Sequence, residues 1–136
     1  MYAESTIPSY ATARPSTDII AAAHQVLTRI FWEEHRHLYD LYVSEYVLEE
    51  CGRGDHEAAR KRMDLVAGIT ILPKTAEIEA LAAVYQKLLD VSNRAKTDCN
   101  HLATCVIRRT DFGRRRSQRR TVLLRPCKEE AYEILH

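Results

Sequence analysis

The chain has 136 residues, which is enough for one domain with a hydrophobic core. Its 46% of hydrophobic residues and 29% of charged residues exclude a chain that is disordered throughout. The formal net charge of +1 hides an asymmetry, because residues 1–107 hold 11 basic and 15 acidic groups, whereas residues 108–136 hold 9 basic and 4 acidic groups. The sequence therefore predicts an acidic body followed by a basic tail.

The cysteine spacing and the hydropathy exclude several classes of protein. The four cysteines form no C-x-x-C pair, which argues against a zinc ribbon and against a thioredoxin motif. No basic stretch followed by an apolar run opens the sequence, and no apolar stretch approaches the roughly 18 residues of a membrane span. We expect a cytoplasmic protein with reduced thiols and no membrane partner.

Hydrophobic periodicity predicts short strands that alternate with helices along the first 108 residues. The predicted strands are residues 1–4, 41–43 and 69–72. The predicted helices are residues 18–39, which are long enough to include a bend, then 45–53, 57–66, 75–89 and 95–108. Pro8 is expected to prevent a long regular element after the first strand, and Ser16 or Thr17 to cap the first helix. This order favours an α/β domain with a parallel sheet, whose ligands bind at the carboxyl ends of the strands.

Three acidic residues fall near that predicted carboxyl edge. Glu4 ends the first strand, Glu50 lies in the helix after the second strand, and Asp98 lies in the first turn of the last helix. Carboxylates gathered at one edge repel one another unless a hard divalent cation such as Mg²⁺ or Mn²⁺ binds between them. Each acid taken alone is better explained as a solvated surface group.

Three segments around these acids resemble, in order, the motifs of PIN-domain ribonucleases. Residues 2–10 resemble the opening strand and loop of that family, residues 43–50 its second motif, and residues 95–103 its third. The resemblance covers about residues 1–112 and implies a PIN-like three-layer α/β/α sandwich with a short parallel sheet. It also implies a Mg²⁺- or Mn²⁺-dependent endoribonuclease that hydrolyses RNA phosphodiesters, similar to the toxin half of a bacterial toxin–antitoxin pair. The partners implied are RNA, a small antitoxin protein and a second copy of the chain.

The resemblance also implies which residues form the site. Glu4, Glu50 and Asp98 would be the catalytic acids that hold the metal, and Thr6 and His101 would support them. Glu49, the neighbour of Glu50, is expected to point about 100° away on its helix and to be solvated. His101 is equally explained as a packed histidine with hydrogen-bond partners.

The resemblance ends after about residue 112, which divides the chain into a PIN-like body, 1–112, and a divergent tail, 113–136. Family members continue into an apolar strand and a Thr-x-Asp or Thr-x-Asn that completes the metal site. Here residues 110–112 reach the expected start of that strand, and Gly113 and a run of arginines follow. Asp111 is a substitute ligand to consider, and residues 122–124 and 128–135 could form a strand and a helix. A shifted reading frame or a divergent end would each explain the change.

The arginine run has a functional and a neutral interpretation. Residues 108–120 hold seven arginines and one acid, a pattern that gives salt-sensitive affinity for a phosphate backbone. The nucleic-acid contacts would come from Arg114, Arg115, Arg116, Arg119 and Arg120. The alternative is a solvated tail without a selected role. For the whole chain, the alternatives to a nuclease are a catalytically silent PIN-like protein that binds nucleic acid or an antitoxin, and a non-functional remnant.

Overall fold

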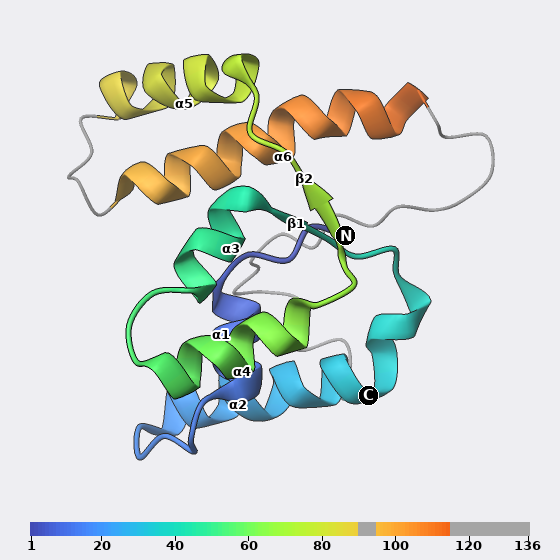
Figure 1. The fold of residues 1–136 in the computed structure, drawn as a ribbon, viewed down its shortest axis with the longest axis vertical. Coiled ribbons are helices and arrows are strands. Elements are labelled where there is room, and N and C mark those ends of the chain that lie inside the picture. Colours follow the sequence, from blue (N-terminus) through green and yellow to red (C-terminus); the bar gives the residue numbers. More distant parts are fainter. Residues whose placement is uncertain (90–94, 115–136) are drawn as a thin grey trace.

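The computed structural model describes residues 1–89 and 95–114 of the chain (Figure 1). The fold is mixed α/β and mostly helical, around a short parallel sheet. Strand β1 (Tyr42–Ser44) pairs with β2 (Thr70–Leu72), so that Val43 lies opposite Ile71. The α-helices in order are α1 (Thr6–Thr12), α2 (Ile19–Ile30), α3 (Glu45–Cys51), α4 (His56–Val66), α5 (Ala76–Leu88) and α6 (Lys96–Arg114).

The first residues of the chain run beside the sheet without forming a full strand. The strand predicted over residues 1–4 is reduced to one parallel bridge between Tyr2 and Tyr42. The Ala3 N–H donates to the Tyr42 carbonyl, and the Tyr42 N–H donates to the Met1 carbonyl, both at 2.8 Å. The segment is thus held as a third, parallel member next to β1, but it leaves the sheet immediately because α1 begins at Thr6.

A short helix, α1, occupies the segment in which Pro8 was expected to prevent a long regular element. Pro8 is the third residue of α1 and is buried. A backbone N–H in the first turn of a helix has no intrahelical partner, so proline loses nothing at this position. The helix ends at Thr12, whose hydroxyl donates to the Pro8 carbonyl at 2.8 Å.

The helical region predicted over residues 18–39 does contain the expected change of geometry. After α2 the backbone continues as a π-helical turn, Phe31–His35, and a 3-10 turn, Arg36–Leu38. The cap differs from the prediction, because the Asp18 carboxylate, and not Ser16 or Thr17, accepts the Ala21 N–H at 2.8 Å. A carboxylate at this position also favours the positive end of the helix dipole.

Helix α6 is longer than the sequence pattern predicts. The pattern ends the helix at Arg108, but it continues to Arg114. Residues 110–112, which the family resemblance placed at the start of a strand, are therefore helical. The predicted strand 122–124 and the predicted helix 128–135 lie outside the described residues.

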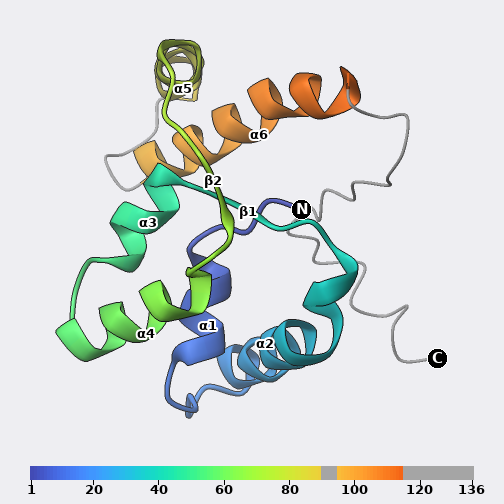
Figure 2. The same ribbon diagram turned by 45° about the vertical axis from the view of Figure 1, so that its right-hand side comes forward.

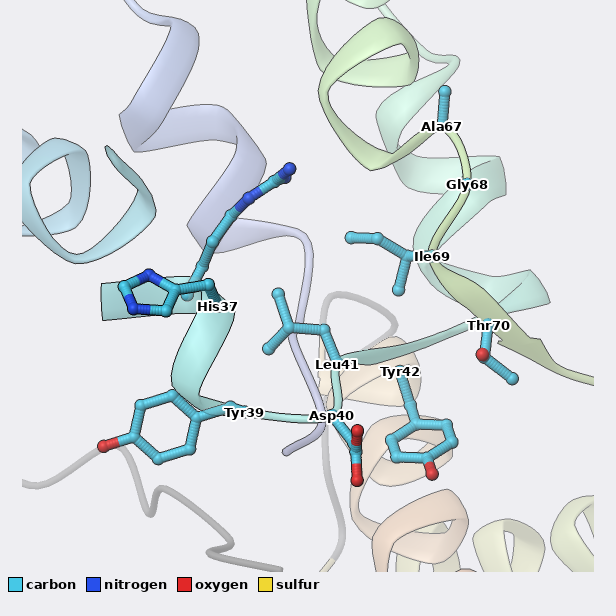
Figure 3. Close-up of a pocket in the computed structure, with 10 residues that line it drawn as sticks. His37, Tyr39, Asp40, Leu41, Tyr42, Ala67, Gly68, Ile69 and Thr70 are labelled. Atoms are coloured by element: carbon cyan, nitrogen blue, oxygen red, sulfur yellow. The ribbon is translucent and has the colours of Figure 1, made fainter. Parts of the chain in front are cut away.

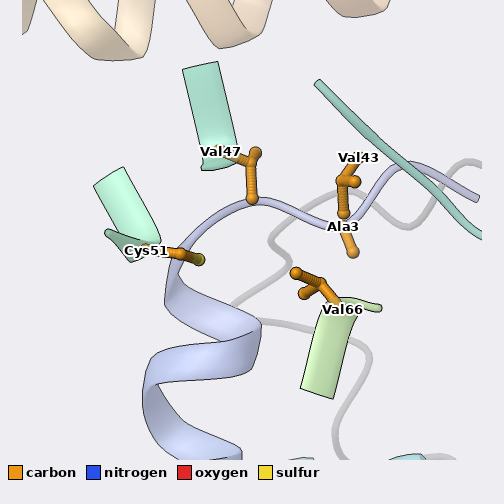
Figure 4. Packing of buried hydrophobic residues seen from close by; sticks show 5 residues of the cluster. All are labelled: Ala3, Val43, Val47, Cys51 and Val66. Carbon is orange, nitrogen blue, oxygen red and sulfur yellow. The ribbon is translucent and has the colours of Figure 1, made fainter. Parts of the chain in front are cut away.

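Two clusters of buried apolar side chains form the core. The first, shown in Figure 4, joins the N-terminal segment to β1, α3 and α4 through Ala3, Val43, Val47, Cys51 and Val66. The second joins α5 and α6 to α3 through Tyr46, Ile78, Ala82, Cys99 and Ala103. In both ribbon views the strands lie between the α5–α6 pair and a group formed by α1, α2 and α4 (Figures 1 and 2). Helix α3 contributes to both clusters and so connects the two halves.

Helix α2 attaches through polar contacts and turns much of its apolar side outward. Its one buried residue is Gln25, which accepts from the Ser16 N–H and donates to the Arg14 carbonyl. Arg29 donates to the carbonyls of Ala11 and Ala13. Five large apolar side chains are exposed, and we call them the α2 stripe: Ile19, Ile20, Val26, Leu27 and Ile30. Over the parts of the chain that the structure describes, no helix is long and apolar enough to cross a membrane.

Candidate functional site

Four side chains form a continuous hydrogen-bonded network at the carboxyl end of β1. The Tyr2 hydroxyl lies 2.8 Å from the Ser44 Oγ and 2.7 Å from the His101 Nδ1. The other ring nitrogen, His101 Nε2, lies 2.8 Å from the Glu50 Oε2. We call these residues, Ser44, Tyr2, His101 and Glu50, the carboxyl-edge network.

Each member of the network is placed by a different element. Ser44 is the last residue of β1 and caps α3, because its Oγ accepts the Val47 N–H at 3.4 Å. Glu50 lies on that same helix, and His101 lies on α6. Tyr2 is brought in by its bridge to β1. The network therefore ties the N-terminal segment, the sheet and two helices to one point.

Burial and nearby carboxylates keep the Tyr2 hydroxyl protonated. Burial raises the pKa of Tyr2 above its usual value, the hydrogen bond with Ser44 acts in the opposite direction, and Cys105, Glu50 and Glu4 raise the pKa further. The two carboxylates of Glu4 and Glu50 are thus both within electrostatic range of one hydroxyl. Burial, helped by Glu4, also raises the pKa of the Cys105 thiol to about 11.

The sequence-predicted acids have different surroundings. Glu4 and Glu50 are half-buried, whereas Asp98 is exposed. Glu49 is exposed and forms an ion pair with Lys74, which confirms that Glu49 and Glu50 point to different sides of α3. His101 is packed and hydrogen-bonded, with an exposed fraction of 8%.

The remaining predicted site residues are not part of this network. Thr6 is exposed on α1. The backbones of Asp111 and Arg114 belong to α6, and their side chains lie outside the described part of the structure. Arg115, Arg116, Arg119 and Arg120 lie outside the described residues.

The carboxylates at this edge could hold a hard cation only if water and substrate oxygens complete its coordination. Mg²⁺ prefers oxygen ligands and is held in many proteins by one or two carboxylates, several waters and the phosphate of a substrate. Glu4 and Glu50 fit that mode, since both are half-buried carboxylates near the same hydroxyl. Within residues 1–89 and 95–109, no group of three or more His, Cys, Asp or Glu residues could hold a metal ion by itself. A metal here would depend on water and substrate oxygens for most of its coordination.

Sequence reasoning missed two residues of the network, Tyr2 and Ser44. Tyr2 precedes Glu4 by two positions, and in an extended segment such positions share a face, so the alternation of side chains could have paired them. Ser44 could be identified as a helix cap, but not as a partner of Tyr2. That contact spans 42 positions along the chain and depends on the register of the bridge.

A separate pocket of about 370 Å³ opens at the other edge of the sheet (Figure 3). Tyr42 and Thr70, which begin β1 and β2, line it together with Arg36, His37 and Asp40. Of the predicted site residues that the structure describes, none lines this pocket. Its position at the amino ends of the strands separates it from the carboxyl-edge network.

No protein-family model, no curated protein and no solved structure matches the chain. The case for a function therefore depends on the geometry of the network and on the motif resemblance.

Proposed function

We propose that the chain is a Mg²⁺- or Mn²⁺-dependent endoribonuclease with a PIN-like three-layer α/β/α fold, similar to the toxin of a toxin–antitoxin pair. One observation carries the proposal. The carboxyl-edge network joins a residue from each of the three motif segments: Tyr2 from the first, Glu50 from the second and His101 from the third. Segments separated by about 50 residues each thus converge at the edge where ligands bind in parallel sheets.

The chemistry follows from the charges at this edge. Glu4 and Glu50 would hold the cation together with the RNA phosphate, and Asp98, exposed in the first turn of α6, would add a carboxylate from the third segment. A bound Mg²⁺ or Mn²⁺ supplies a more acidic water and compensates charge on the phosphate. The hydrogen bond from His101 holds the Glu50 carboxylate in place before the RNA arrives. The proposal includes a cytoplasmic location for the protein, where RNA is present as a substrate.

Cleavage of single-stranded RNA by the purified full chain tests this proposal directly. We expect cleavage with Mn²⁺, none with excess chelator, and a loss of activity in Glu50→Gln and Asp98→Asn. Glu49→Gln is the matched control, because Glu49 lies on the same helix but is paired with Lys74 on the exposed side. Circular dichroism of each variant checks that the fold is kept. A folded wild-type protein that leaves RNA intact with Mn²⁺ contradicts the nuclease function.

The second candidate is a catalytically silent PIN-like protein that binds an antitoxin or nucleic acid. Two observations favour it. The described side chains form no three-ligand group, and the α2 stripe exposes Ile19 and Ile20 by 84% and 69%. Contiguous exposed apolar surface of this kind is typical of protein-binding sites. Binding of RNA or of a partner that is unchanged in Glu50→Gln, without any cleavage, would support this candidate against the nuclease.

A further inference from the structure

We propose that Tyr2 and His101 are positioning residues that fix the Glu50 carboxylate through hydrogen bonds donated in a single direction, from Ser44 to Tyr2, to His101 and to Glu50. The inference rests on the proposed function, in which Glu50 holds the cation. It adds Tyr2, to which the motif resemblance assigns no role, and it specifies how His101 supports Glu50.

The direction of donation follows from the groups at the two ends. At one end, the Ser44 Oγ accepts the Val47 N–H, so its own O–H can donate to the Tyr2 oxygen. At the other end, a carboxylate only accepts, so His101 must present Nε2–H to Glu50. The neutral ring then has a lone pair on Nδ1, which accepts the Tyr2 O–H.

The reverse direction leaves a repulsive contact. If Tyr2 accepted from a neutral His101, the ring would carry its proton on Nδ1. Its Nε2 lone pair would then face the Glu50 Oε2 at 2.8 Å, with no hydrogen between two acceptors. A half-satisfied buried network of this kind is costly. For a neutral ring, the one-way arrangement satisfies every member and selects the Nε2–H tautomer of His101.

His101 is buried, whereas the Glu50 carboxylate is partly exposed and can bind a cation. His101 is 8% exposed, and both of its nitrogens are engaged, so the ring is not available to exchange a proton with a substrate. The Glu50 side chain keeps 23% exposure while its Oε2 is held. Glu50 can therefore meet a cation, and His101 determines how the carboxylate is oriented when it does so.

Tyr2 connects this orientation to the sheet. Its backbone is bridged to Tyr42 of β1, and its ring lies 5.9 Å from the His101 ring, centroid to centroid. Removal of the Tyr2 hydroxyl alone leaves the ring contact in place but deprives the His101 Nδ1 of its donor. Tyr2→Phe is therefore the substitution that tests positioning with the least change in packing.

The experiment measures two quantities on the full chain: Mn²⁺ affinity, with the metal alone as probe, and the tautomer of His101 by ¹⁵N NMR. We expect the Nε2–H tautomer in the wild type, and a shift of the Nδ1 resonance and of the Glu50 carboxyl ¹³C resonance in Tyr2→Phe.

Loss of a group that orients a metal ligand lowers metal affinity by about 10–100-fold. We expect that loss in Tyr2→Phe and His101→Ala, and partial recovery in His101→Gln, whose amide can still donate to Glu50. Tyr39→Phe and Glu49→Gln are controls and should bind Mn²⁺ like the wild type.

The outcomes separate this inference from the proposed function. Wild-type affinity for Mn²⁺ in a folded Tyr2→Phe variant overturns the positioning role and leaves the nuclease proposal intact. An absence of Mn²⁺ binding in the wild type rejects the metal-dependent function, and the NMR signals then decide the positioning role alone. In that case an Nδ1–H tautomer, or a Glu50 carboxyl resonance that does not respond to Tyr2→Phe, overturns it.

Discussion

The Nε2 atom of His101 lies 2.8 Å from the Oε2 atom of Glu50, and the two residues are 51 positions apart in the sequence. This contact ties α6 to α3, whereas the neighbouring Glu49 of α3 pairs with Lys74. A histidine that is 8% exposed can keep such a contact only if its second nitrogen also has a partner, and Tyr2 provides it. The stability of the fold and the geometry of the candidate site therefore depend on the same hydrogen bonds.

The Tyr2→Phe substitution should reduce the free energy of unfolding by about 1–3 kcal/mol, the usual cost of leaving a buried acceptor without its donor. The acceptor is the His101 Nδ1, and the Ser44 hydroxyl loses its partner as well. Urea denaturation followed by the fluorescence of Trp32, which is buried and is the single tryptophan of the chain, measures the change.

Tyr39→Phe is the control for this measurement, because the Tyr39 ring packs at a tilt against Phe31, outside the carboxyl-edge network. It should change the free energy of unfolding by less than about 0.5 kcal/mol. Equal losses in the two variants would show that the Tyr2 hydroxyl contributes no specific stability.

Substitution of one buried and one exposed isoleucine compares how much α5 and α2 contribute to the stability of the core. Ile78 of α5 is fully buried against α6, whereas Ile20 of α2 is 69% exposed. Ile78→Ala should lower the free energy of unfolding by about 2–5 kcal/mol because it opens a cavity in the second core cluster. Ile20→Ala should change it by less than about 0.5 kcal/mol.

The same urea titrations provide the outcome that would contradict this division. A large loss in Ile20→Ala would mean that the α2 stripe is covered in solution. The dependence of that loss on protein concentration would then distinguish coverage by a second copy from coverage within one chain.

Local chemistry explains the parts of the fold that the sequence predicted correctly. Ser44 and Asp55 directly precede α3 and α4, whose helices the sequence pattern predicts, and each caps its helix by accepting a backbone N–H three residues later. Such caps depend only on neighbouring residues, so a sequence pattern is enough to locate them. The different orientations of Glu49 and Glu50 were also predictable, because they follow from the rotation of a helix by 100° per residue.

Long-range packing explains what could not be predicted. The periodicity of α2 identifies a helix but does not say which side is covered, and Gln25 and Arg29 attach it by polar contacts instead of the α2 stripe. Likewise, nothing near His101 in the sequence indicates Glu50 as its partner. In the metal-site hypothesis Asp98 was favoured over His101, but it is His101 that contacts Glu50 in the structure.

The Cys105 thiol should react slowly with iodoacetamide in the folded protein. Burial and Glu4 raise its pKa to about 11, two units above the usual value of 9.0. At pH 8 the reactive thiolate is then about 100-fold scarcer than in the unfolded chain. Alkylation followed by peptide mapping, with and without urea, measures the ratio. Equal rates in the two conditions would contradict the shielded environment of Cys105.

The same shift makes stability depend on alkaline pH. Because the folded state binds the thiol proton more tightly than the unfolded state, the contribution of Cys105 is complete below about pH 9 and is lost as the pH rises towards 11. Burial raises the pKa of Tyr2 as well, so its contribution decreases in the same direction. Urea midpoints should therefore fall above pH 9, and less steeply in Cys105→Ala. An identical fall in both proteins would assign the effect to other groups.

The basic tail should contribute salt-dependent affinity for RNA, and the structure indicates where to cut the chain to test this. Helix α6 continues to Arg114, so truncation after that residue removes four of the predicted RNA-contacting arginines and leaves the helix whole. Each phosphate contact on single-stranded RNA contributes a slope of about −0.7 to log K against log salt. The truncated chain should therefore bind RNA more weakly and with a shallower slope, measured by fluorescence anisotropy from low to high salt.

A full-length variant with Arg115, Arg116, Arg119 and Arg120 changed to Gln separates the effect of charge from the effect of chain length, because it should behave like the truncated chain. Full affinity in that variant would show that the arginines are a solvated tail without a role in binding.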